Sequence, residues 1–300
     1  MPNAGIRILL AELVDYAGLF PPAQLDMAGA VRAYAGYRDG AFSWMLGRFI
    51  ARAAQLDEFE QAAAALLPAY AADEPWRLSI LTSGSADDLE RIDAFNARHS
   101  HPAEGLAVVD TIETKAGSVE AIEKLIQSSR GGTTMYIEIP VADDPADLIA
   151  AIGGRGARAK VRTGGVTGDV FPPPDELARF IRACVDAGVP FKATAGLHHP
   201  LRGAYRLTYA DDSERGMMYG FLNVFLAAAF ATHGLPLADI ESLLQTSDPA
   251  TLTIDDSGAT WRGHRLDLDD LRHARLRAAT TFGSCSFTEP VDDLHSLRLL

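Results

Sequence analysis

Cysteine is scarce in this sequence of 300 residues: Cys184 and Cys285 are its only two, and they lie far apart. Two distant cysteines exclude a disulfide framework and a cysteine-rich zinc site, and they suit a reducing cytoplasm. The sequence also lacks an HExxH motif, a GxGxxG loop after a predicted strand and a P-loop. The sequence therefore has none of these motifs, which are typical of zinc proteases and of nucleotide-binding proteins. We therefore expect no metal and no cofactor.

Basic residues are outnumbered by acidic ones. Lys and Arg total 27 while Asp and Glu total 40, so the net charge is −13 at pH 7. A surface of that sign repels phosphate backbones, and we expect no nucleic-acid partner. The hydrophobic content of 48% is nevertheless typical of a globular chain and argues against a disordered one.

Long hydrophobic runs are missing too. The most apolar stretch, Met217–Thr232, is shorter than the roughly 20 residues that span a membrane, and it contains Asn223. A helix buried in a protein core explains this stretch better. The N-terminus has no basic start, and Glu12 and Asp15 interrupt its apolar residues, which is unlike a signal peptide. We therefore predict a cytoplasmic protein without a membrane partner.

The middle of the chain alternates between short β-rich runs and longer helical runs. The expected strands are 44–50, 77–82, 106–111, 135–140, 159–163 and 190–195. The expected helices between them are 56–71, 87–98, 118–127, 145–152 and 174–187. Strands that alternate with helices at this spacing predict βαβ units and a parallel sheet.

Two α/β architectures fit this alternation, an open doubly wound sheet and a closed (β/α)8 barrel. A barrel needs about 250 residues, which this chain can supply. Residues 15–20 and 281–287 are candidates for the two further strands. Polar residues follow many different strands, whereas an open sheet concentrates them at one switch point. We therefore favour a (β/α)8 TIM-like barrel.

The chain after residue 200 breaks the alternation. It contains the apolar stretch, a short helix at 237–245, a hairpin that turns at 256–258, and a helix at 268–279. We predict one barrel domain, 1–300, with a C-terminal helical and hairpin insertion at 200–280.

Lysines on consecutive strands are the strongest chemical signal. Lys160 and Arg162 share one face of the strand at 159–163, because alternate side chains of a strand point the same way. Lys192 and Thr194 share a face of the next strand, and adjacent parallel strands lie about 4.8 Å apart. Two inward lysines depress each other's pKa, as burial also does. A lysine made neutral in this way is the nucleophile of Schiff-base enzymes.

A structural explanation stands beside this one. An inward lysine is often half of a buried ion pair, and Glu138 and Asp110 are available as partners. Two lysines and an arginine on adjacent strands need several carboxylates, or an anionic ligand, to balance them. We therefore predict a functional site in which Asp110 or Glu138 moves protons.

Two of these segments are similar to a known family. The segment Lys160-Val161-Arg162-Thr163-Gly164 resembles the Lys-x-x-Thr-Gly strand end of deoxyribose-phosphate aldolases, and residues 192–198 look like their following strand, Lys-Ala-x-x-Gly-Ile-Arg. Residues 281–286 resemble the small-residue end of their last strand. The resemblance implies that Lys160 forms the Schiff base, that Lys192 tunes its pKa and that Asp110 assists proton transfer. His198 replaces a phosphate-contacting arginine of that family.

Residues 15–23 and 196–203 also resemble a bacterial family, to which we attach no activity. Asp15 and the Pro21-Pro22 pair belong to a stiff loop that we expect near the mouth of the barrel. Further candidates for the same mouth are Glu113, Lys115 and Glu289.

Substrate-binding residues are expected where the strands end. The predicted set is Arg48, Arg162, Thr163, Gly164, Thr194, Gly196, His198 and His199. The glycines suit a backbone cradle for an anion, or ordinary turns. His198 suits an acid/base or an anion ligand, or a loop histidine that caps a carbonyl.

We predict a lyase of the aldolase type that acts on a small anionic carbonyl compound through a lysine Schiff base. One alternative is a barrel isomerase or transferase that binds a phosphorylated or carboxylated ligand without covalent chemistry. A second is a non-catalytic barrel that binds a ligand or a partner through Met217–Phe230. The expected partner is the small anionic substrate, and assembly into a homo-oligomer stays open.

Overall fold

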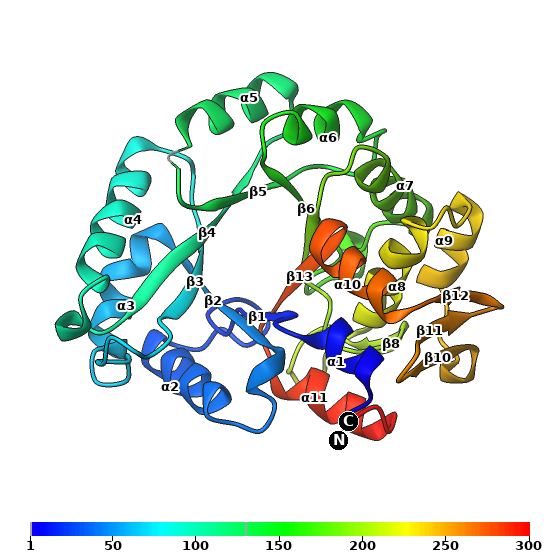
Figure 1. The fold of residues 1–300 in the computed structure, drawn as a ribbon, viewed down its shortest axis with the longest axis horizontal. Coiled ribbons are helices and arrows are strands. Elements are labelled where there is room, and N and C mark those ends of the chain that lie inside the picture. Colours follow the sequence, from blue (N-terminus) through cyan, green and yellow to red (C-terminus); the bar gives the residue numbers. More distant parts are fainter. Residues whose placement is uncertain (1, 130) are drawn as a thin grey trace.

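Eight parallel strands close into a barrel in a computed structural model that describes residues 2–129 and 131–300 (Figure 1). Around the barrel they follow the order β1, β13, β7, β6, β5, β4, β3, β2. Their bounds are β1 Val14–Tyr16, β2 Leu46–Arg52, β3 Trp76–Leu81, β4 Ala107–Lys115, β5 Thr134–Glu138, β6 Arg158–Arg162, β7 Phe191–Thr194 and β13 Ala279–Ser284. The (β/α)8 TIM-like fold is therefore confirmed.

Helices surround the strands and cover their outer faces (Figure 1). They are α1 Ala4–Leu10, α2 Met27–Arg38, α3 Leu56–Ala63, α4 Ala86–His99, α5 Val119–Ser128, α6 Ala146–Gly153, α7 Pro174–Asp186, α8 Phe221–Ala231, α9 Leu237–Leu244, α10 Leu268–Arg277 and α11 Thr288–Ser296. Sequence patterns miss α2 and α11. The expected helix at 56–71 ends early at Ala63, because the chain turns there ahead of Pro68.

Strand β4 extends well beyond its expected end at residue 111. It pairs with β3 as far as Glu113 and with β5 as far as Lys115. Its register against β3 shifts between Val109 and Thr111, so Asp110 lies at a bulge. Glu113 was expected in the loop after this strand. It lies within β4, and its side chain is buried in the barrel.

The chain from β7 to β13 contains more β-structure than expected. An antiparallel hairpin, β8 Gly203–Arg206 and β9 Arg215–Met218, follows β7. A small sheet, β10 Leu252–Asp255, β11 Gly258–Trp261 and β12 His264–Leu266, includes the expected hairpin and one more strand.

The apolar stretch forms α8, and every residue of this helix is buried. Helix α8 packs against α7, α9, α10 and β13, so it is a core helix of the barrel wall. This burial leaves no apolar partner surface along α8. Among the helices of the described residues, none is long and apolar enough to cross a membrane.

Candidate active site

The parallel register of four strands brings the predicted lysines together. Lys160 of β6 pairs in register with Lys192 of β7 and, on the other side, with Glu138 of β5. Glu138 in turn pairs with Lys115, the last residue of β4. Charged side chains therefore form a row across β4, β5, β6 and β7 toward the carboxyl ends of the strands, the catalytic face of such barrels.

Three carboxylates hold the two buried lysines in what we name the lysine–carboxylate chain: Asp15, Lys192, Glu113, Lys160 and Glu138. Lys192 Nζ donates to Asp15 Oδ2 and to Glu113 Oε1, both at 2.6 Å. Lys160 Nζ lies 2.8 Å from Glu113 Oε2 and 3.0 Å from Glu138 Oε2. Glu113 thus bridges the two ammonium groups. All five side chains are buried, so their charges interact with little solvent screening.

These carboxylates raise the pKa of Lys192, where a lowered pKa was expected. Burial lowers the pKa of Lys192, but Asp15 and Glu113 outweigh burial and raise that pKa above its ordinary value of 10.5. The prediction that the paired lysines depress each other's pKa is therefore wrong for Lys192. Burial raises the pKa of Glu113 and of Glu138, but the neighbouring lysines outweigh it and hold both pKa values below 4.5.

The depressed carboxylate pKa values predict a loss of stability in acid. Unfolded Glu113 and Glu138 titrate near their ordinary value of 4.5 and so bind protons at a higher pH than the folded groups. The free energy of unfolding should therefore fall as the pH drops below about 5. Urea unfolding measured from about pH 7 to 3 tests this, and Glu113→Gln should make the acid decline shallower. Equal declines in the variant and the wild type would contradict the prediction.

A cavity of about 400 Å³ opens over the lysine–carboxylate chain at the mouth of the barrel. We call it the mouth cavity. Its charged and polar lining comprises Arg52, Glu113, Lys115, Glu138, Lys160, Arg162, Thr194, His198 and Cys285. Backbone at Gly196 and the expected loop residues Pro21 and Pro22 also line it. Lys160 reaches this cavity, whereas Lys192 lies behind it with 0% exposure.

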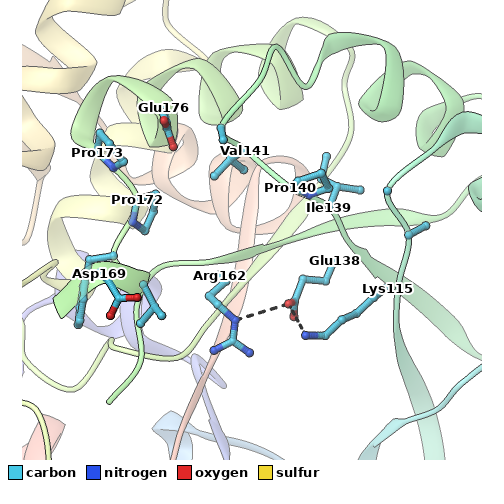
Figure 2. Close-up of a pocket in the computed structure, with 15 residues that line it drawn as sticks. Lys115, Glu138, Ile139, Pro140, Val141, Arg162, Asp169, Pro172, Pro173 and Glu176 are labelled. Carbon is cyan, nitrogen blue, oxygen red and sulfur yellow. Dashed lines mark ion pairs between the residues drawn. The ribbon is translucent and has the colours of Figure 1, made fainter. Parts of the chain in front are cut away.

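A second hollow of about 660 Å³ adjoins the mouth cavity and shares Lys115, Glu138 and Arg162 with it (Figure 2). Lys115 Nζ lies 2.8 Å from Glu138 Oε1, and Arg162 Nε lies 3.6 Å from the same oxygen. Prolines 140, 172 and 173 with Ile139 and Val141 form its apolar walls. The hollow offers room for a substrate that extends beyond the mouth cavity.

Two predicted residues shape the mouth without lining it. Thr163 Oγ1 donates to the Ala195 carbonyl oxygen at 2.6 Å and so ties the end of β6 to the end of β7. Gly164 lies under Phe171, where a Cβ would come within 2.3 Å of the ring. Gly196 and Ala195 both have left-handed backbone, with φ of 72° and 60°, which turns the chain sharply after β7.

The two histidines after β7 point to different carboxylates of α11. His198 Nδ1 lies 2.9 Å from Glu289 Oε2, and His199 Nδ1 lies 2.5 Å from Asp293 Oδ2. His198 lines the mouth cavity. His199 stacks on Tyr205 and lines an adjoining pocket of about 220 Å³ beside the β8–β9 hairpin, which His198 also lines. The structure therefore places His198, and not His199, at the mouth cavity.

Asp110 and Arg48 pair with each other near the amino-terminal end of the barrel. Arg48 Nε lies 2.5 Å from Asp110 Oδ1, and Arg77 Nε lies 2.8 Å from Asp110 Oδ2. Arg77 also pairs with Glu12, which precedes β1. Neither Asp110 nor Arg48 lines the mouth cavity, so the structure does not bring them together with Lys160. Strand β4 continues to Lys115, which leaves Asp110 well short of the strand's carboxyl end.

Several residues of the mouth were not among the predicted catalytic or binding residues. Glu113 and Asp15 are the carboxylates that contact Lys192, where Asp110 had been expected near the lysines. Arg52, four residues further along β2 than Arg48, is the arginine of β2 that lines the mouth cavity. The scarcity of lysine could have indicated the charged row, because the sequence has only four lysines, at positions 115, 124, 160 and 192. Three of the four belong to the charged row across the strands.

No group of three or more His, Cys, Asp or Glu is arranged to hold a metal ion within residues 2–129 and 131–300. Comparison of the sequence with protein-family models and with curated proteins found no match. The geometry of the mouth is therefore the basis for assigning a function.

Proposed function

We propose that the protein is a lyase of the aldolase type that forms a Schiff base between Lys160 and a small anionic carbonyl compound. One observation supports this above all others. Lys160 lines the mouth cavity, and its Nζ contacts Glu113 Oε2 and Glu138 Oε2. The amine thus meets both the space for a substrate and the groups that can take its proton.

The carboxylates supply the proton chemistry at the lysine nitrogen. An ammonium group must lose a proton before its nitrogen attacks a carbonyl carbon, and Glu113 or Glu138 can accept that proton. The new C–N bond then becomes an iminium as the carbonyl oxygen, with two protons, leaves as water. Cleavage of the carbon–carbon bond then sends its electron pair into the iminium and leaves an enamine. The hydroxyl on the departing carbon loses its proton to water and becomes the carbonyl group of the released fragment. The two carboxylates stabilise the positive iminium throughout.

Lys192 has a different part in this proposal. It is fully buried behind Lys160, and its two short contacts hold Asp15 and Glu113 in place as charged groups. Lys192 therefore orients the carboxylate that serves Lys160, as a positioning residue.

The charge of the mouth favours an anionic substrate. Arg52 and Arg162 line the cavity, and the nearest carboxylate oxygen to Arg162 is 3.6 Å away. Among the described residues Arg52 contacts only the Gln55 amide oxygen and the Phe20 ring, so its charge has no carboxylate partner. Cationic groups at a cavity of a protein with net charge −13 attract and orient an anion.

The balance of charges around the lysines also fits a second function. Three carboxylates already compensate Lys160 and Lys192, so these lysines need no covalent role. In that case the barrel would bind a phosphorylated or carboxylated ligand and catalyse an isomerisation or a group transfer.

Borohydride trapping separates the two functions. The protein is incubated with small aldehydes, keto acids and sugar phosphates, reduced with sodium borohydride and examined by intact mass and peptide mapping. We expect a stable adduct on Lys160 with at least one anionic carbonyl compound. Reduction without a carbonyl compound is the blank, and a known class I aldolase is the positive control. If the control is labelled and this protein never is, the non-covalent function is favoured, and ligands are then sought by thermal shift.

A further inference from the structure

A Schiff-base lyase moves protons at two places, the lysine nitrogen and a carbon atom of the substrate. Glu113 and Glu138 lie beside the nitrogen of Lys160. The proton at the substrate carbon needs a group that faces the mouth cavity and has a free lone pair. Only a few titratable side chains of the described residues line this cavity, and each can be considered in turn.

Cations lie next to both carboxylates of the cavity, although Glu138 Oε2 accepts no hydrogen bond from the described residues. Glu113 Oε1 accepts from Lys192 and from Ser79, both at 2.6 Å, and its Oε2 faces Lys160. Glu138 faces Lys115 with Oε1 and Lys160 with Oε2. These cations hold the pKa of both carboxylates below the ordinary value, which makes them weak bases.

Cys285 is also unsuited to the task. Burial raises the pKa of its thiol, and the nearby Tyr209 hydroxyl lies 3.6 Å from its sulfur. The thiol therefore stays protonated near neutral pH. The remaining titratable residues of the lining are lysines and arginines, together with one histidine, His198.

His198 is held as a base that faces the cavity. Its Nδ1 lies 2.9 Å from Glu289 Oε2, and the Tyr209 hydroxyl donates to the same oxygen at 2.9 Å. Burial raises the pKa of Glu289, but His198 outweighs it and keeps the pKa below 4.5, so Glu289 is an ionised acceptor and Nδ1 carries the hydrogen. Among residues 2–129 and 131–300 the ring of His198 bonds through Nδ1, which leaves the Nε2 lone pair for a substrate in the cavity that His198 lines.

We propose that His198 is the acid/base that transfers the proton at the substrate carbon next to the Schiff base, and that Glu289 and Tyr209 position it. This inference rests on the Schiff-base function proposed above. His198 Nε2 removes the proton from that carbon, the C–H electron pair becomes the enamine C=C bond, and the C=N pair moves onto the nitrogen of Lys160. The reverse step returns the proton to carbon after the carbon–carbon bond has broken.

The experiment measures the two proton sites separately. Pyruvate and, as an uncharged counterpart, acetaldehyde are incubated with the protein in D₂O, and loss of the methyl proton signal is followed by NMR. Parallel samples are reduced with borohydride to measure the adduct on Lys160. His198→Gln and Glu289→Gln are compared with His233→Gln, a histidine paired with Asp270 at 2.8 Å outside the mouth.

We expect His198→Gln to slow exchange about 100-fold or more while the adduct stays close to wild type. Glu289→Gln should slow exchange less and also keep the adduct, and His233→Gln should change neither. Wild-type exchange in His198→Gln would overturn the inference and leave the Schiff-base proposal intact. Loss of the adduct together with exchange in that variant would also overturn it, because His198 would then serve folding or binding. A wild type that forms no adduct with these probes or with any other carbonyl compound of the trapping panel would overturn both proposals.

Discussion

Replacement of Lys160 by arginine is expected to abolish the borohydride-stable adduct while the protein stays folded. A guanidinium keeps its proton at any physiological pH and has no free electron pair for attack on a carbonyl. It keeps the positive charge beside Glu113 and Glu138, so these carboxylates stay paired. The adduct in Lys160→Arg should therefore fall to the level of the blank without a carbonyl compound.

The matched control for this variant is Lys124→Arg. Lys124 lies exposed on the outer helix α5, so its replacement should leave the adduct unchanged. Thermal shift with inorganic phosphate and pyruvate checks that Lys160→Arg still folds and still binds anions. An adduct that persists in Lys160→Arg and maps to Lys192 would show that the nucleophile has been assigned to the wrong lysine.

Replacement of Lys192 by methionine is expected to lower the free energy of unfolding by about 3–5 kcal/mol. Methionine fills a similar volume but leaves Asp15 and Glu113 without the ammonium group that now lies 2.6 Å from each. Lys192 is 0% exposed, so water does not replace the lost contacts. Urea unfolding at pH 7 measures the loss.

Two further variants show whether unpaired charge is the cause. Lys124→Met removes an exposed lysine and should change stability by no more than about 0.5 kcal/mol. Adding Asp15→Asn to Lys192→Met removes one stranded carboxylate and should restore part of the lost stability. A loss below about 1 kcal/mol in Lys192→Met alone would mean that the buried chain of charges contributes little to folding.

Local sequence patterns were sufficient for most elements of the barrel. Ser85 accepts a hydrogen bond from Asp88 N and begins α4 at the expected place. Pro174 lies at the first position of α7, which ends just before Gly188. Both are local signals, because a cap and a proline act on their own turn of helix. The ends of β1 and β4 were missed, because strand ends depend on pairing with distant segments.

Only part of the candidate site was predicted, because the rest of it depends on contacts between segments that are distant in the sequence. Alternation along two strands placed Lys160 and Lys192 side by side, and the register confirms that pairing. Alternation gave no account of Asp15, which lies on β1 and contacts Lys192 across the barrel interior. The resemblance suggested Asp110 for proton transfer, and the expected strand ended one residue after it, whereas β4 continues to Lys115.

The sequence by itself determined the α/β alternation, the closure into a (β/α)8 barrel and the pairing of two inward lysines. These features depend on the periodicity of side chains and on the order of elements along the chain. Only the tertiary structure decided which charges surround the lysines. Asp15, Glu113 and Glu138 come from three different strands, and closure of the barrel brings them within 3.0 Å of an ammonium group. That closure places carboxylates beside two cations that otherwise repel each other, and burial strengthens the attraction between these opposite charges.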